Sequence, residues 1–132
     1  MILSYQINTP ISPEQFADII RRSGLRRPLD SLDRLAQMLE HANLTITAWD
    51  GDKLVGISRS LTDFSYCCYL SDLAVDREYQ RQGIGQELVR RTQETLGDEV
   101  MILLLASPEA MEYYPHIGFE KLNNAFRIPR KN

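Results

Sequence analysis

The spacing of hydrophobic residues predicts two amphipathic helices in the first third of the chain. Ser12 precedes a proline and a glutamate, which is typical of a capped helix start. Apolar residues then recur at helical spacing until Gly24, a residue that commonly ends a helix. Asp30 or Ser31 can cap a second helix of the same kind, which would end within residues 41–43. Each helix would therefore turn one apolar face toward a core.

Strand patterns surround and follow these helices. Residues 44–49 and 54–58 flank a turn at residues 50–53, which contains the aspartate and glycine typical of a β-hairpin. A third strand is expected over residues 67–75, and residues 3–7 can form a short opening strand. The centre of the chain is therefore predicted to be an antiparallel meander.

The last third alternates between the two patterns. A helix is expected from residue 83 to residue 96, with Gly97 as its stop. Residues 100–106 form a continuous apolar run, which favours a fully buried central strand. A short helix over residues 108–116 and a final strand from Gly118 would complete an α/β domain with a mixed sheet.

Composition and charge narrow the function. The 132 residues suit one domain, and the net charge of -3 argues against a nucleic-acid partner. The first residues lack the pattern of a signal peptide, and no window approaches the roughly 18 apolar residues of a membrane span. We therefore expect a cytoplasmic protein with no membrane partner. The only cysteines, Cys67 and Cys68, are adjacent and lack metal-ligand spacing, so no metal is expected.

A strand, a turn, a glycine-rich loop and a helix follow one another over residues 70–89. A helix N-terminus exposes unpaired main-chain N–H groups, and glycine lets a phosphate approach them closely. Gly83 and Gly85 alone can equally serve tight packing. The lysine of a P-loop is absent, and the preceding hairpins disfavour a dinucleotide fold.

Two motifs resemble those of the GNAT superfamily of N-acetyltransferases. The first is the Q/R-x-x-G-x-G/A loop, here Gln80-Arg81-Gln82-Gly83-Ile84-Gly85, preceded by the strand-like Leu73-Ala74-Val75-Asp76. The second is a tyrosine-bearing helix before a Gly-Phe turn, here Tyr113-Tyr114-Pro115-His116-Ile117-Gly118-Phe119. The resemblance extends over most of the chain. It implies a single domain over residues 1–132, with a largely antiparallel central sheet and helices on both faces.

The resemblance also implies acetyl-coenzyme A as cosubstrate. Main-chain groups of Leu73, Ala74 and Val75 would bind the pantetheine arm as an added strand would. A main-chain N–H of Leu73 or Val75 would stabilise the oxyanion, where this strand and residues 100–106 diverge. The diphosphate contacts would fall on Arg81, Gln82, Gly83, Ile84, Gly85 and Gln86. The expected reaction is direct acetyl transfer, in a ternary complex, to a primary amine of a small molecule or a protein.

Tyr114 matches the position at which many family members place a general acid beside the coenzyme sulfur. The alternative is that Tyr114 only packs in the core, and Tyr113 competes for the role without matching the family position. The first candidate for the general base is Asp72, although a strand aspartate can equally be paired or act as a cap. Histidine is a residue type suited to a general base, but His41 and His116 are typical of solvated helix ends.

Other interpretations stay open at this point. A non-catalytic acetyl-coenzyme A binding or sensing module would keep the loop but not the turnover. Ser107 and a proline stand where many family members have an asparagine that contacts the coenzyme. Arg26 and Arg27 could meet an acidic group of the substrate or face solvent. Phe126 and Ile128 are candidates for a homodimer interface, with a monomer as the alternative.

Overall fold

The computed structural model describes residues 2–132. Its elements are β1 (Leu3–Ile7), α1 (Pro13–Ser23), α2 (Leu32–His41), β2 (Leu44–Asp50), β3 (Lys53–Thr62), β4 (Cys67–Val75), the 3₁₀-helix η1 (Arg77–Tyr79), α3 (Ile84–Leu96), β5 (Met101–Leu103), the 3₁₀-helix η2 (Pro108–Ala110) and α4 (Tyr113–His116). The predicted elements before residue 97 are confirmed, within a few residues at their ends.

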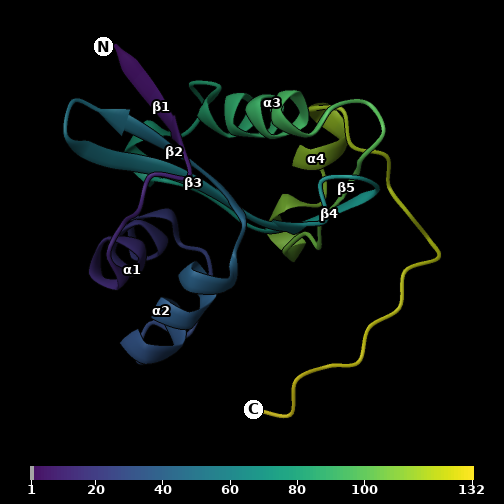
Figure 1. Cartoon of the computed structure of the whole chain (residues 1–132), viewed down its shortest axis with the longest axis horizontal. Helices are drawn as coiled ribbons and strands as arrows, with labels where there is room; N and C mark the ends of the chain where they lie inside the picture. Colours follow the sequence, from purple (N-terminus) through teal and green to yellow (C-terminus); the bar gives the residue numbers. More distant parts are fainter. Residues whose placement is uncertain (1) are drawn as a thin grey trace.

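The sheet has the strand order β1-β2-β3-β4-β5 (Figure 1). Strands β1 to β4 pair antiparallel in sequence order, which confirms the predicted meander. Strand β5 runs parallel to β4 and pairs with it over three residues only, from Cys67 opposite Met101 to Tyr69 opposite Leu103. Beyond Tyr69, the side of β4 that faces β5 has no strand neighbour among residues 2–132.

Helices cover both faces of the sheet (Figure 1). On one face, Phe16 and Ile19 of α1 pack with Leu35 of α2 against Ile57 of β3. On the other face, Leu88 of α3 belongs to a second core cluster with residues of β2 and β3. The first helix begins as its sequence predicts, because Ser12 and Gln15 form a reciprocal capping box. The predicted α/β architecture with a largely antiparallel sheet is therefore confirmed.

The expectation of a fully buried central strand over residues 100–106 is wrong. Regular strand structure is limited to β5, which lies at the edge of the sheet. Met101 is 56% exposed and Leu105 is 59% exposed. The apolar run cannot be covered on its outer side because the following residues add no further strand there.

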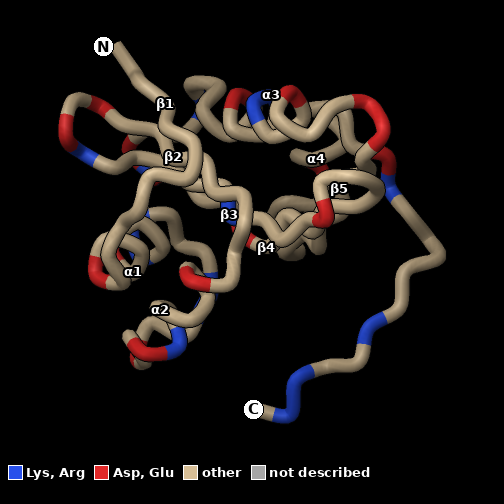
Figure 2. The backbone as a smooth tube through the Cα atoms, viewed as in Figure 1, with Lys and Arg blue, Asp and Glu red and all other residues tan. Residues whose placement is uncertain are grey.

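The expectation of a final strand from Gly118 is also wrong. Residues 119–132 have no regular secondary structure and run away from the sheet (Figure 1). Phe126 and Ile128 are each 98% exposed. Every charged residue after Glu120 is basic, which gives the end of the chain its blue segments in Figure 2. A three-residue edge at β5 offers few main-chain groups for pairing, and Pro129 cannot donate a bond.

The helix expected over residues 108–116 is divided. Its first part is the 3₁₀-helix η2, and its second part is the single turn α4. Ser107 stands before η2 but makes no side-chain capping bond there. None of the helices among residues 2–132 has both the length and the apolar character needed to cross a membrane.

Candidate active site

The loop between η1 and α3 takes the form that an anion site needs. Arg81 and Gly83 both have left-handed backbone conformations, with φ angles of 66° and 81°. Gly83 stands at the N-cap of α3 and provides no side-chain cap, so the first N–H groups of the helix are not satisfied by it. The loop residues 81–83 and Gln86 are exposed. The loop can therefore present main-chain donors and the positive end of α3 to a phosphate group.

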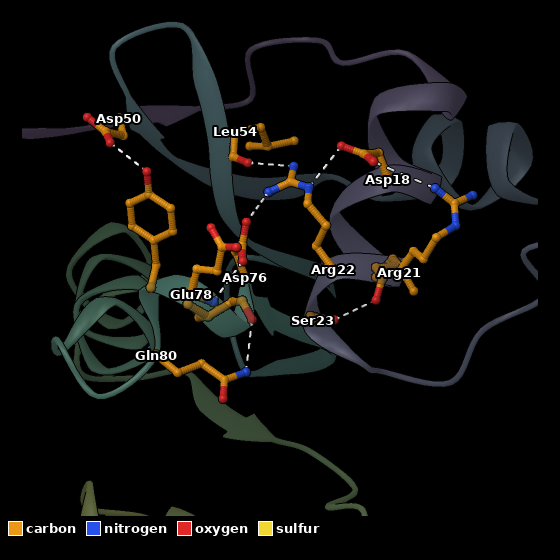
Figure 3. Close-up of polar contacts among 12 residues, drawn as sticks. Asp18, Arg21, Arg22, Ser23, Asp50, Leu54, Asp76, Glu78 and Gln80 are labelled. Carbon is orange, nitrogen blue, oxygen red and sulfur yellow. Dashed lines mark hydrogen bonds and ion pairs between the residues drawn. The ribbon is translucent and has the colours of Figure 1, made fainter.

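Buried polar contacts hold the start of this loop (Figure 3). Asp76, which follows β4, is 3% exposed, and its carboxylate accepts bonds from Glu78 N (2.9 Å) and Arg22 Nη1 (2.5 Å). Arg22 comes from α1 and also donates to the carbonyl of Leu54 (2.7 Å). Burial tends to raise the pKa of Asp76, but these bonds outweigh it and hold the pKa below its usual range. Helix α1 is thus fixed to the segment that leads into the loop.

Replacing Arg22 by methionine is expected to lower the free energy of unfolding by about 2 kcal/mol. Asp76 would lose its cationic partner while staying buried, and the cost is reduced because the Arg22 side chain is 25% exposed. Urea unfolding followed by circular dichroism measures the change.

Arg21→Met is the matched control for this substitution. Arg21 is 62% exposed and lies 3.6 Å from Asp18, so its loss should cost less than about 0.5 kcal/mol. Equal effects of the two substitutions would show that the bond to Asp76 does not anchor the loop.

Strand β4 presents main-chain groups on its open side. Asp76 N donates to Val55 O of β3 (2.9 Å), so by two-residue alternation the main-chain groups of Ala74 face β3 and those of Leu73 and Val75 face away from it. The carbonyl of Val75 accepts a bond from the Gln80 side chain (3.0 Å). Because β5 stops pairing at Tyr69, the N–H groups of Leu73 and Val75 point toward the gap where the two strands part.

The side chain of Asp72 is committed to two arginines. It is fully buried, and one carboxylate oxygen accepts from Arg27 Nε (2.5 Å) while the other accepts from Arg59 Nε. Arg27 further donates to the carbonyl of Ser71 (2.7 Å). Both oxygens of this carboxylate are thus occupied by guanidinium groups and shielded from solvent, which leaves no free oxygen for an acceptor amine. The paired interpretation of Asp72 is the one that the structure favours, and the Arg27 guanidinium is bound to Asp72 and to the carbonyl of Ser71 while its side chain stays partly exposed.

Tyr114 lies on α4, half-buried between two other aromatic rings. Its ring contacts Tyr113 edge to face, with centroids 5.3 Å apart, and Phe119 in the same way at 5.5 Å. Burial is the main cause that raises the pKa of Tyr114 above its usual value; Tyr113 adds to the rise, and the charge of Arg27 opposes it. The phenol therefore keeps its proton at neutral pH and can act as an acid.

An apolar cavity of about 570 Å³ lies beside Tyr114. It is lined by residues 101–106, by α4 and by the start of the C-terminal segment. Its ionisable lining consists of Tyr114, Glu120, Lys121 and Arg127. The cavity is large enough for a small organic molecule, and a single carboxylate gives it little capacity for several cations.

Tyr113 contacts the loop. From the sequence it was only an alternative to Tyr114 as the general acid. A Cβ placed on Gly85 would lie 2.5 Å from the Tyr113 hydroxyl oxygen, so this hydroxyl packs against the bare Cα of Gly85. No sequence signal joins the two residues, because the contact forms only when α4 docks beside the start of α3. His41 and His116 lie at the ends of α2 and α4, and the ring of His41 contacts its own helix at Gln37 O.

Residues 12–128 match the family model of the acetyltransferase (GNAT) domain. The chain is 36% identical over 70 residues to the chloroplastic GCN5-related N-acetyltransferase 2 of Arabidopsis thaliana, a match that covers 52% of this chain and 27% of that protein. It is 34% identical over 70 residues to a histone acetyltransferase of Glycine max, with coverages of 52% and 30%. The matches thus span less than a third of these relatives.

Solved structures share the fold. A GNAT family acetyltransferase of Streptococcus pneumoniae superposes with a TM-score of 0.79 at 23% identity, over 98% of this chain and 100% of that one. A probable acetyltransferase of Staphylococcus aureus gives 0.83 at 20% identity, over 99% and 100%. An aminoglycoside N-acetyltransferase in complex with coenzyme A gives 0.71 at 13% identity, over 99% and 96%.

Proposed function

Since this chain belongs to the GNAT acetyltransferase family, we propose that it is an enzyme that transfers the acetyl group of acetyl-coenzyme A to a primary amine. The observation that carries the proposal is the open side of β4 next to the uncapped start of α3. These features fit an extended arm that ends in a diphosphate. Acetyl-coenzyme A supplies the acetyl group as an activated thioester.

Each part of the site has a role in this proposal. Main-chain N–H groups over residues 81–86 bind the diphosphate, as a helix N-terminus binds anions. Main-chain groups of Leu73, Ala74 and Val75 hold the pantetheine arm, with the outward groups of Leu73 and Val75 as its bonding partners. One of these two N–H groups donates to the thioester oxygen and stabilises the charge that develops there. Tyr114 gives its proton to the departing sulfur.

The acceptor is proposed to be an amine with an apolar body. Relatives include proteins named for histones and for aminoglycosides. A polycationic aminoglycoside would need several carboxylates, whereas the cavity beside Tyr114 has Glu120 alone and two basic side chains. A protein amine and a small apolar amine both remain compatible with an opening of this kind.

Calorimetric titration and thiol release test the function. We expect the protein to bind acetyl-coenzyme A with one site per chain, to show no binding of ATP at the same concentration, and to release free thiol with apolar amines faster than with an aminoglycoside. Absence of coenzyme binding would overturn the proposal. Tight binding with no thiol release above background, across small amines and lysine-containing peptides, would establish the non-catalytic binding module instead.

A further inference from the structure

Tyr113 stands at the junction of three elements that surround the proposed coenzyme site. It is the first residue of α4, and its hydroxyl lies against Gly85 in the first turn of α3. The side chain of Val75, at the end of β4, approaches the same point of Gly85, 3.8 Å from a Cβ placed there. The open side of β4 and the start of α3 therefore meet beside this hydroxyl.

The Tyr113 hydroxyl is available for a bond to a ligand. The side chain is 40% exposed, and no group among residues 2–132 forms a hydrogen bond with the hydroxyl, so burial alone raises its pKa. A hydroxyl that is exposed and has no protein partner can bond a ligand. Because the pKa is raised, the phenol stays protonated and remains a donor at neutral pH.

We propose that Tyr113 is a coenzyme-binding residue whose hydroxyl donates a hydrogen bond to a diphosphate oxygen, at the place where the arm along β4 reaches the start of α3. The inference rests on the proposed function and adds a side chain to a site otherwise made of main chain. A diphosphate oxygen is a strong acceptor, and a bond to a charged acceptor is stronger than one between neutral groups. Gly85 fits this arrangement, because a Cβ at this position would displace the hydroxyl.

Tyr113→Phe tests the assignment by binding rather than by turnover. We expect the dissociation constant of coenzyme A, measured by calorimetry, to rise about tenfold. The dissociation constant of adenosine 3′-phosphate 5′-diphosphate, which keeps the diphosphate and lacks the pantetheine arm, should rise by a similar factor. The urea midpoint of the ligand-free variant should not change, because the hydroxyl has no partner in the protein.

Tyr79→Phe is the matched control. The Tyr79 hydroxyl donates to Asp50 Oδ2 (2.6 Å), so this substitution should lower the urea midpoint and leave coenzyme affinity within twofold. An unchanged coenzyme affinity in Tyr113→Phe would overturn the inference. Weaker binding of coenzyme A with unchanged binding of the nucleotide would also overturn it, because the hydroxyl would then bond the pantetheine arm. So would weaker coenzyme binding together with a lower urea midpoint, because the substitution would then have disturbed the fold. Failure of the unmodified protein to bind coenzyme A would instead refute the proposed function.

Discussion

Replacing Tyr114 by phenylalanine is expected to lower kcat about 100-fold. The substitution removes the proton donor that the proposed function assigns to the departing sulfur, and a general acid contributes on this scale. The phenyl ring keeps the edge-to-face contacts with Tyr113 and Phe119, so the fold should be retained. Steady-state thiol release at saturating acetyl-coenzyme A measures the change.

The coenzyme affinity of Tyr114→Phe shows whether Tyr114 acts in the chemical step or in coenzyme binding. The dissociation constant of coenzyme A should stay within twofold in Tyr114→Phe, in contrast to Tyr113→Phe. The acid is needed in its protonated form, and burial raises its pKa, so activity of the unmodified enzyme should persist until above pH 10. An unchanged kcat in the variant would remove Tyr114 from the chemistry.

Replacing Asp72 by asparagine is expected to lower the free energy of unfolding by about 3–5 kcal/mol. Asparagine has the shape of aspartate but no charge, so Arg59, whose side chain is only 6% exposed, would lose its anionic partner in the interior. Arg27 would lose its partner as well, at a smaller cost because it is 27% exposed. Urea unfolding measures the loss.

Two further variants show whether charge pairing is the cause. Adding Arg59→Met to Asp72→Asn should recover part of the stability, because the uncompensated buried cation is removed. Asp18→Asn should cost less than about 1 kcal/mol, since Asp18 is 54% exposed in its own ion pairs. A double variant no more stable than Asp72→Asn would contradict the charge-pairing explanation.

The pH profile decides whether Asp72 also acts as a base. With its carboxylate held by Arg27 and Arg59, we expect the acid limb of kcat/KM to follow the pKa of the acceptor amine and to move when the acceptor changes. The folded Asp72→Asn variant should keep that limb. Its disappearance in the variant, with the fold intact, would restore Asp72 as the general base.

Local sequence rules accounted for most elements before residue 97. The Ser12 cap, the Gly24 stop after α1, the Asp-Gly turn between β2 and β3 and the glycine stop after α3 all appear where they were predicted. These signals depend on bonds between residues a few positions apart. The sequence could therefore specify them without knowledge of the rest of the chain.

The errors lie where a segment depends on distant neighbours. An apolar run such as residues 100–106 predicts a buried strand, but burial requires another element to cover the run. The C-terminal segment does not form a strand that covers it here. Asp72 looked available for catalysis because neither Arg27 nor Arg59 is its neighbour in sequence. The pairing of β3 with β4 brings Arg59 to it, and the docking of the α1–α2 connection brings Arg27.

The sequence alone determined that a strand, a glycine-rich loop and a helix follow one another over residues 70–89, because each of these signals is local. It also identified the family, through the Gln80–Gly85 loop and the Tyr113–Phe119 motif together. The tertiary structure alone decided that Asp72 is neutralised by two arginines and that Tyr113 reaches Gly85. Charge pairing and side-chain contact depend on which distant groups meet after packing. The order of residues along the chain does not reveal which groups these are.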